Sequence, residues 1–435
     1  MPNHVPAPPT GRALAEPGGP YRCLSSVAAA RNRPSGIVAC LDCDTRQQVP
    51  PPAPRTIVPC LACGNTLERT HGRSIRAALA CSLATLLLLV PGNLTTFLTT
   101  RALGISRHSV VGSAAGAMLK DGWPFLALVV LLFAVVFPLV RFASLSAVLV
   151  SVERRRSRGW QGRAFRWANE LETWAMPDVF VLGLAVAYFR LAAAINVSLG
   201  PGAICYILAA VLSLFARATL DKAEVWRRIA PDRDDAPDRP TIACFHCEQV
   251  HPATDEGHAC TRCGYTLRRR KRFAVPRTLA LTLAAVLLYI PANLYPIATL
   301  PINYQPLKYT VLEGVIDLAK AGLLGLSALV FTASFAIPIL KLLGLGWCVS
   351  SVMRRSPARL VAKTRAYRVV EEVGRWSMVD PFVIGCFVPV MHYNSLIYGR
   401  AEAAAVPFTA VVVLTIISAK TFDPRLMWDA RADRG

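Results

Sequence analysis

Eight long apolar runs divide the chain, and their pattern predicts its class. They cover residues 75–98, 123–152, 175–194, 203–220, 278–300, 321–352, 377–391 and 403–419. Most reach or approach the roughly 20 residues that a helix needs to cross a bilayer. The run 377–391 is short and contains Pro381 and Pro389, but its counterpart 175–194 is clearer. Eight such runs indicate a polytopic membrane protein rather than a soluble protein with buried core helices.

Basic residues alternate between the connecting loops. Arginines cluster after the second and sixth runs and around the break between the fourth and fifth, whereas the other loops hold scattered cations. Positively charged loops stay on the cytoplasmic side, so we expect these loops and both termini in the cytoplasm. The composition agrees, with 54% hydrophobic and only 17% charged residues. The net charge of +21 then follows from topology, and no nucleic-acid partner is needed to explain it.

The two halves of the chain repeat each other in register. Matched pairs at an offset of 200, and later of 202, include Asn93 with Asn293, Lys120 with Lys320, Pro138 with Pro338, Trp174 with Trp376, and Asp178 with Asp380. Each copy holds an even number of apolar runs, so both copies have the same orientation. The pattern predicts a parallel repeat related by an axis along the membrane normal.

Each copy begins with two C-x₂-C pairs. They are Cys40, Cys43, Cys60 and Cys63 in the first copy, and Cys244, Cys247, Cys260 and Cys263 in the second. Four thiolates suit tetrahedral zinc, with iron as the alternative metal, and they leave no open position for a catalytic water. A C-x-x-C redox pair is the rival interpretation, but no βαβ pattern surrounds either pair. We expect two structural zinc sites, with the nearby His246, His251 and His258 at solvated surfaces.

These features predict an all-α polytopic membrane protein built from two tandem repeats, each a zinc ribbon plus four transmembrane helices. The expected units are a disordered proline-rich tail at 1–39, ribbons at 40–68 and 244–268, bundles at 75–220 and 277–420, a linker at 227–243, and a cytoplasmic tail at 421–435. A signal peptide is not expected, because the proline-rich start contains no apolar core region.

Ionisable residues in or beside the apolar runs are the candidate functional positions, since charge within a membrane is costly. They are Lys320, Lys341, Asp380 and His392 in the second copy, and Lys120, Arg141 and Asp178 in the first. Each has a plainer interpretation: snorkelling for Arg141 and Lys341, helix capping or ion pairing for the two aspartates, and outer anchoring for Lys120 and Lys320. We expect Asp178 and Asp380 near the cytoplasmic starts of their spans, with Lys341 as the nearest partner of Asp380.

The doubled ribbon-and-bundle unit resembles the paraquat-inducible protein A family of bacterial inner-membrane proteins. The resemblance covers residues 40–430 and is carried by the C-x₂-C pairs, the Pro-x-Asn-Leu segments, Trp376-Ser377-Met378-Val379-Asp380 and Lys420-Thr421-Phe422-Asp423-Pro424-Arg425. It implies an inner-membrane location and a periplasmic mammalian-cell-entry (MCE) domain partner that forms a tunnel for lipids. The long proline-rich start departs from the family pattern. Trp174-Ala175-Met176-Pro177-Asp178 also departs, because its proline precedes the aspartate.

The expected function is to pass lipid between the inner membrane and a periplasmic MCE tunnel, with acyl chains held in cavities between or within the halves. The candidate residues would form a polar, proton-linked path. An enzyme is not expected, since neither a Gly-rich phosphate loop nor a nucleophile elbow appears. Two other hypotheses stay open at this point: a membrane thiol redox protein, and a zinc-ribbon scaffold without transport activity.

Overall fold

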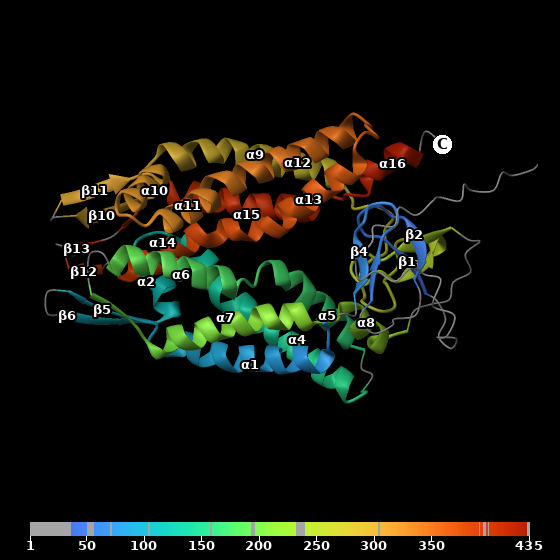
Figure 1. Ribbon diagram of the computed structural model, residues 1–435, viewed down its shortest axis with the longest axis horizontal. Helices are drawn as coiled ribbons and strands as arrows, with labels where there is room; N and C mark the ends of the chain where they lie inside the picture. The colour runs from blue at the N-terminus through green and yellow to red at the C-terminus, as the bar shows by residue number, and fades with distance from the viewer. Residues whose placement is uncertain are drawn as a thin grey trace, which may run out of the picture.

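The computed structural model describes residues 36–49, 56–69, 72–102, 105–156, 159–192, 196–231, 240–302, 305–390, 392–394, 397–398 and 400–432. The molecule is elongated, with two helical bundles side by side and the two cysteine modules together at one end (Figure 1). Small sheets form the opposite end. We refer to these as the ribbon end and the sheet end.

The first bundle consists of four long helical segments. They are α1 (Ile75–Leu94), α3 (Pro124–Val130) continued by α4 (Phe137–Glu153), α6 (Pro177–Ala192) and α7 (Pro201–Thr219). Proline opens three of these segments, where its missing N–H costs nothing. Ser74 caps α1, because its hydroxyl accepts a hydrogen bond from the backbone N–H of Ala77 at 3.4 Å. A π-helical segment, Leu131–Val136, joins α3 to α4 just before Pro138.

The second bundle repeats this order. Its segments are α9 (Ala274–Leu294), α11 (Leu324–Phe331) continued by α12 (Ile337–Met353), α14 (Val379–Val390) and α15 (Ala405–Thr421). The π-helical segment recurs at Thr332–Ala336, just before Pro338. Within the described chain, six helical segments are long and apolar enough to cross a membrane, four in the first bundle and two in the second. In the first bundle α6 counts only together with the helix before it, as the continuous stretch Gln161–Phe189. The other two are shorter: α15 has 17 residues and α14 has 12.

Short helices that the apolar runs did not indicate lie at both ends. Toward the sheet end are the amphipathic helices α2 (Val111–Lys120) and α10 (Val311–Lys320), and toward the ribbon end are α5 (Gln161–Glu170), α8 (Lys222–Ile229), α13 (Leu360–Gly374) and α16 (Leu426–Ala432). The last helix lies in the segment expected to be a tail. The helix α8 covers most of the gap between the expected first bundle and the expected linker, together with the first three residues of that linker. Their polar composition hid them from an argument based on apolar length.

Small antiparallel sheets add to the mainly helical fold. At the sheet end, β5 (Leu98–Ala102) lies between β6 (Ile105–Ser109) and β7 (Asn196–Leu199), and β10 (Ala298–Ile302) lies between β11 (Gln305–Tyr309) and β14 (Arg400–Ala401). A further pair joins β12 (His392–Asn394) to β13 (Ile397–Tyr398). The starts of β5 and β10 were expected to be the last turns of spans, because their apolar residues continue the preceding runs.

The cysteine modules are built from hairpins. They contain β1 (Gly36–Ala39), β2 (Arg46–Val49), β3 (Ile57–Pro59), β4 (Thr66–Arg69), β8 (Thr241–Ala243) and β9 (Val250–Pro252). β1 pairs with β2 through Gly36 opposite Val49, so the first ribbon begins at least four residues before the expected boundary at 40. Residues 1–35 of the expected tail lie outside the described residues.

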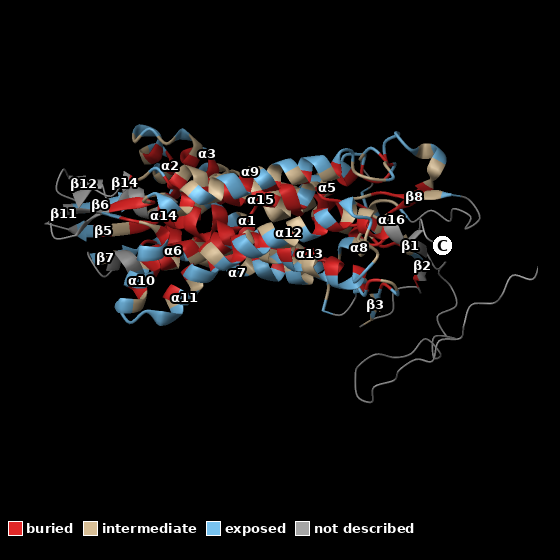
Figure 2. Cartoon of the chain, turned by 90° about the horizontal axis from the view of Figure 1, so that it is seen from above, coloured by how far each residue is buried: buried red, intermediate tan, exposed pale blue. Residues whose placement is uncertain are grey.

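The two bundles meet along α6 and α14. The rings of Phe180 and Phe382 lie 5.3 Å apart there. A Cβ atom at Gly183 would come within 2.9 Å of the Phe382 Cβ, so only glycine lets the two helices approach this closely. Buried residues follow the middle of the molecule along its length, and exposed residues lie on its outer faces (Figure 2). Large exposed apolar side chains such as Leu87 and Leu287 suit contact with lipid.

Each ribbon packs on the bundle of the other repeat. The first ribbon shares a buried cluster with Tyr367 of α13 and with Phe422 and Trp428 near the C-terminus. The second ribbon shares a buried cluster with Phe165 of α5 and Trp226 of α8. The repeats are therefore crossed at the ribbon end, an arrangement that the sequence did not indicate.

Candidate functional site

Two groups of four buried cysteines form the strongest candidate metal centres. In each group the four Sγ atoms lie within 4.8 Å of one another. The Sγ–Sγ distances are 3.6 Å for Cys40 and Cys63 and 3.4 Å for Cys244 and Cys263. These distances are far longer than a disulfide bond of about 2.05 Å. They are close to the roughly 3.8 Å expected between sulfurs around a tetrahedral zinc with Zn–S near 2.3 Å.

The backbone of each C-x₂-C pair makes the tight turn that brings its two thiols together. The residue after the second cysteine is left-handed in all four turns, with φ of 62° at Asp44, 70° at Gly64, 61° at Glu248 and 69° at Gly264. In the turn that starts at Cys260, the N–H of Gly264 donates a hydrogen bond to the carbonyl oxygen of Cys260 at 2.8 Å. These turns direct both side chains of a pair toward one point, so the donor set fits a closed four-thiolate site.

Groups beside the cysteines complete the second ribbon. His251 is fully buried, and its Nε2 lies 3.4 Å from the Cys260 Sγ, so the expectation that it is solvated is wrong. Neighbours of this kind hold metal ligands in place. Burial, with Arg166 and Lys271 nearby, lowers the pKa of His246 to about 4. This imidazole is therefore neutral near pH 7, where its ring packs 4.4 Å from that of Tyr265.

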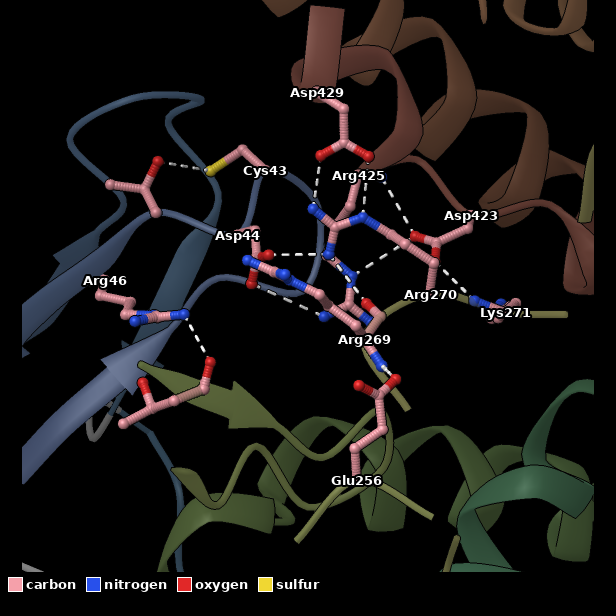
Figure 3. Close-up of polar contacts among 12 residues, drawn as sticks. Cys43, Asp44, Arg46, Glu256, Arg269, Arg270, Lys271, Asp423, Arg425 and Asp429 are labelled. Carbon is pink, nitrogen blue, oxygen red and sulfur yellow. Dashed lines mark hydrogen bonds and ion pairs between the residues drawn. The ribbon is translucent and has the colours of Figure 1, made fainter. Parts of the chain in front are cut away.

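The first ribbon is held to the second half by ion pairs. Arg368 of α13 donates to Asp42 at 2.6 Å and to the Cys63 Sγ at 3.1 Å. Arg270 lies between Asp44 of the first ribbon, at 2.8 Å, and Asp429 of α16, at 2.5 Å (Figure 3). Because these charges pair across segments far apart in the sequence, the ribbon is fixed to the C-terminal bundle.

Two neighbouring groups of buried polar contacts lie in the second bundle, and each includes one of the predicted residues, Lys341 or Asp380. We call them together the polar chain. Lys341 of α12 is 1% exposed. Its ammonium donates to the carbonyl of Gly374 at 3.2 Å and to the hydroxyl of Ser377 at 3.1 Å. These partners are neutral. The expected pairing of Lys341 with Asp380 does not appear among the described ion pairs.

Asp380 lies one helical turn beyond Ser377, on α14. Its carboxylate accepts a hydrogen bond from Ser334, which lies in the π-helical segment of the same bundle. Asp380 also lines a cavity of about 40 Å³ together with Ile297 and Tyr309, which belong to the sheet end. That volume suits a few water molecules rather than an acyl chain.

We expected Asp380 near the cytoplasmic start of its span, and in the structure it lies in the first turn of α14. The helical path into the bundle begins earlier, at Leu360 of α13, and passes through a 3₁₀ turn at Arg375–Met378 before α14. Residues 360–374 are too polar to register as part of an apolar run. The carboxylate is thus about 20 residues, or roughly 30 Å of helix, beyond the start of this path.

The first copy replaces this chain of neutral contacts with ion pairs. Glu172 lies 2.7 Å from Lys222, 3.4 Å from Arg217 and 3.8 Å from Arg141. Arg217 in turn lies 3.8 Å from Asp178. The positions that match Glu172 and Arg217 in the second copy are Gly374 and Ala419. Sequence reasoning overlooked Glu172, because this residue precedes the apolar run. The alignment of the two copies did hold a signal, since it places a charged glutamate opposite a glycine.

The remaining predicted residues lie apart from these clusters. Lys120 and Lys320 are exposed and end α2 and α10 at the sheet end, where they fit the anchoring interpretation. The backbone of His392 begins β12, and its side chain lies outside the described residues. The structure therefore brings Lys341 and Asp380 into one bundle interior, and Arg141 and Asp178 into the other.

Comparison with known proteins identifies the relatives of this chain. It is 28% identical over 405 residues to the intermembrane transport protein PqiA of Escherichia coli K12, covering 91% of this chain and 96% of that protein. It is 29% identical over 263 residues to the lipophilic envelope-spanning tunnel protein A of the same strain, covering 60% and 61%. A probable intermembrane transport protein of Haemophilus influenzae is 24% identical over 412 residues, covering 91% and 96%.

The comparison with solved structures finds no match. The family profile described as paraquat-inducible protein A matches residues 75–230 and 275–432, one match for each repeat. Those two segments hold both helical bundles and exclude the cysteine modules. The chain belongs to the paraquat-inducible protein A family.

Proposed function

We propose that this protein is the inner-membrane subunit of an intermembrane lipid transport system, which passes lipid between the membrane and a periplasmic MCE tunnel. Family membership and the names of the relatives, which describe intermembrane transport and an envelope-spanning tunnel, support transport as the general role. The clustering of arginines in loops at the ribbon end supports a cytoplasmic location for the ribbons and both termini.

The observation that carries the proposal is the buried polar chain of the second bundle. An ammonium group at Lys341 with only neutral described partners and a carboxylate at Asp380 beside a water-sized cavity are costly inside a membrane. The first copy has neutralised its equivalents with ion pairs. We infer that the second copy moves protons along this chain and that the first copy is mainly structural.

The asymmetry between the copies gives the test. We expect Asp380→Asn to abolish lipid-dependent growth while protein abundance and metal content stay near normal. The matched control is Asp178→Asn in the first copy, which should affect growth less. If Asp380→Asn instead lowers protein abundance, the carboxylate serves folding. If growth and abundance both stay normal, Asp380 does not belong to the transport path.

The two rival functions make different predictions. A thiol redox protein requires reactive, metal-free cysteines, whereas eight buried thiols in two closed groups favour bound metal. A scaffold without transport would tolerate Lys341→Met and Asp380→Asn together, provided that the ribbons stay folded. Growth of that double variant, measured with its abundance, separates a scaffold from a transporter.

A further inference from the structure

A large basic cavity lies at the ribbon end of the first bundle. Its volume is about 800 Å³, and it lies where the start of α1, the end of α4 and the starts of α5 and α8 converge. Five arginines line it: Arg73, Arg76, Arg155, Arg156 and Arg228. Neither the metal centres nor the polar chain includes any of these residues.

The acidic residues of this cavity are already engaged. Glu153 lies 2.6 Å from Arg76 and 3.5 Å from Arg228, and Glu224 lies 2.9 Å from Arg228. Asp221 caps α8, because its carboxylate accepts from the N–H of Glu224 at 3.0 Å. The cavity therefore keeps a surplus of positive charge, with five arginines against three acids.

Three of the arginines make no ion pair among the described residues: Arg73, Arg155 and Arg156. Arg155 is near enough to Glu153 for their charges to interact, but the two do not form an ion pair. The Nε of Arg73 is buried, and no hydrogen-bond acceptor for it lies in the described part of the chain. The start of α1, at Ser74 and Ile75, lines the same cavity, and a helix start adds partial positive charge. These groups together favour a ligand with a phosphate oxygen.

The outer face of α1 indicates where such a ligand comes from. Arg76, Leu83, Leu87 and Leu94 are spaced at 7, 4 and 7 residues, so they follow one another on one face of the helix. The three leucines are 37%, 71% and 74% exposed. A phosphate bound in the cavity, beside Arg76, would thus be joined to acyl chains lying along an apolar stripe of a candidate membrane span.

The second copy does not repeat this basic cavity. Its residues at the positions of Arg73, Arg76, Arg156 and Arg228 are Phe273, Pro276, Ser356 and Ala430, and the fifth position alone keeps an arginine, Arg355. The local scaffold is nevertheless conserved between copies. Gln161 donates to Ser151 at 2.8 Å, and its counterpart Lys363 donates to Ser351 at 2.6 Å. The absence of these arginines from the second copy is therefore a local difference in charge, and the surrounding fold is the same in both copies.

We propose that this cavity binds the phosphate headgroup of an anionic phospholipid from the membrane leaflet at the ribbon end. Basic pockets between helix ends bind such headgroups through charge and geometry together. This inference goes beyond the transport proposal, because lipid binding at this site is measurable on the purified chain without a tunnel partner, and either proposal can fail alone.

The test measures how much phosphatidylglycerol or phosphatidylcholine the purified, delipidated full chain retains in detergent, by native mass spectrometry at physiological ionic strength. The test variant carries Arg73→Gln, Arg155→Gln and Arg156→Gln. The control carries Arg354→Gln, Arg355→Gln and Arg359→Gln, which removes the same charge at the same end of the second copy. The double variant Arg155→Gln, Arg156→Gln changes only exposed side chains. It is therefore expected to fold normally, so a loss of lipid binding in it does not reflect misfolding.

We expect the chain to prefer phosphatidylglycerol, and the triple variant to lose that affinity by about two orders of magnitude, since each basic residue contributes about fivefold. The double variant should lose roughly 25-fold on the same basis, and the control triple should lose little. Equal losses in test and control triples, or an unchanged test triple, overturn the proposal. Displacement of the lipid by millimolar inorganic phosphate would assign the cavity to a soluble phosphate instead.

Discussion

At the scale of single residues, one glycine distinguishes the two copies. Gly374 stands where the first copy has Glu172, and its carbonyl accepts a hydrogen bond from the Lys341 ammonium. A Cβ atom at Gly374 would lie 3.4 Å from the Lys341 Cε, which is an ordinary contact. The glycine therefore does not exist to avoid a clash. It leaves the lysine without the carboxylate that neutralises Arg141 in the other copy.

This difference predicts the effect of Gly374→Glu. The new carboxylate should pair with Lys341, as Glu172 pairs with Arg141, and the free energy of unfolding should stay within about 2 kcal/mol of the wild type, because ion pairing offsets desolvation. Transport should nevertheless fall, since a permanently paired ammonium cannot release its proton. Thermal unfolding and lipid-dependent growth measure the two effects.

The control for that experiment is Gly374→Ala, which adds only the Cβ. Alanine is favoured over glycine by up to about 1 kcal/mol in a helix, so this variant should be folded and active. Loss of growth in both variants would mean that the position is sensitive to size, and Lys341 would then lose its proposed role.

At the scale of elements, the close crossing of α6 and α14 joins the two bundles. The contact depends on Gly183, since a Cβ there would come within 2.9 Å of the Phe382 Cβ and 3.2 Å of the Val379 carbonyl oxygen. α14 also carries Asp380. A change in the crossing is therefore transmitted directly to the helix that holds the carboxylate.

Gly183→Leu should separate these helices and lower the free energy of unfolding by about 1–3 kcal/mol, as overpacking does in close-packed interiors. The matched control is Gly346→Leu on α12, where a Cβ would meet nothing within 4 Å. Thermal unfolding in detergent should show a lower midpoint for Gly183→Leu alone. Equal midpoints for the two variants would contradict the tight crossing.

At the scale of the whole molecule, the crossed ribbons predict which bundle each metal site stabilises. Replacing Cys40 and Cys43 with serine should remove one of two expected zinc ions, because a structural site needs its full ligand set. The resulting loss of amide protection should appear in α13 and α16, which hold the first ribbon. Hydrogen exchange and metal analysis together measure this.

The reciprocal variant, with Cys244 and Cys247 replaced by serine, serves as the control. It should expose α5 and α8 of the first bundle, where Phe165 and Trp226 contact the second ribbon. If each variant instead loosens the bundle that follows it in sequence, the crossed arrangement is wrong. Full metal-free stability in either variant would contradict a structural role for the metal.

Much of this architecture could be predicted from the sequence, because apolar length and cysteine spacing are local signals. The family, the mainly helical membrane fold and the two cysteine groups are confirmed. The partner of Asp380 could not be predicted, since Ser334 is an ordinary small residue within an apolar run. The crossing of the ribbons was also hidden, because Arg368 and Asp42 meet across 326 positions of sequence.

The crossed ribbons also impose an order on assembly at the ribosome. The second ribbon can dock on the bundle made just before it, but the first ribbon must wait for Tyr367 and Trp428 to be synthesised. At roughly 5–20 residues per second, that wait lasts tens of seconds. During this interval the first ribbon has no bundle surface to cover it. Metal bound early by its four cysteines would keep it folded until the last helix arrives and closes the molecule.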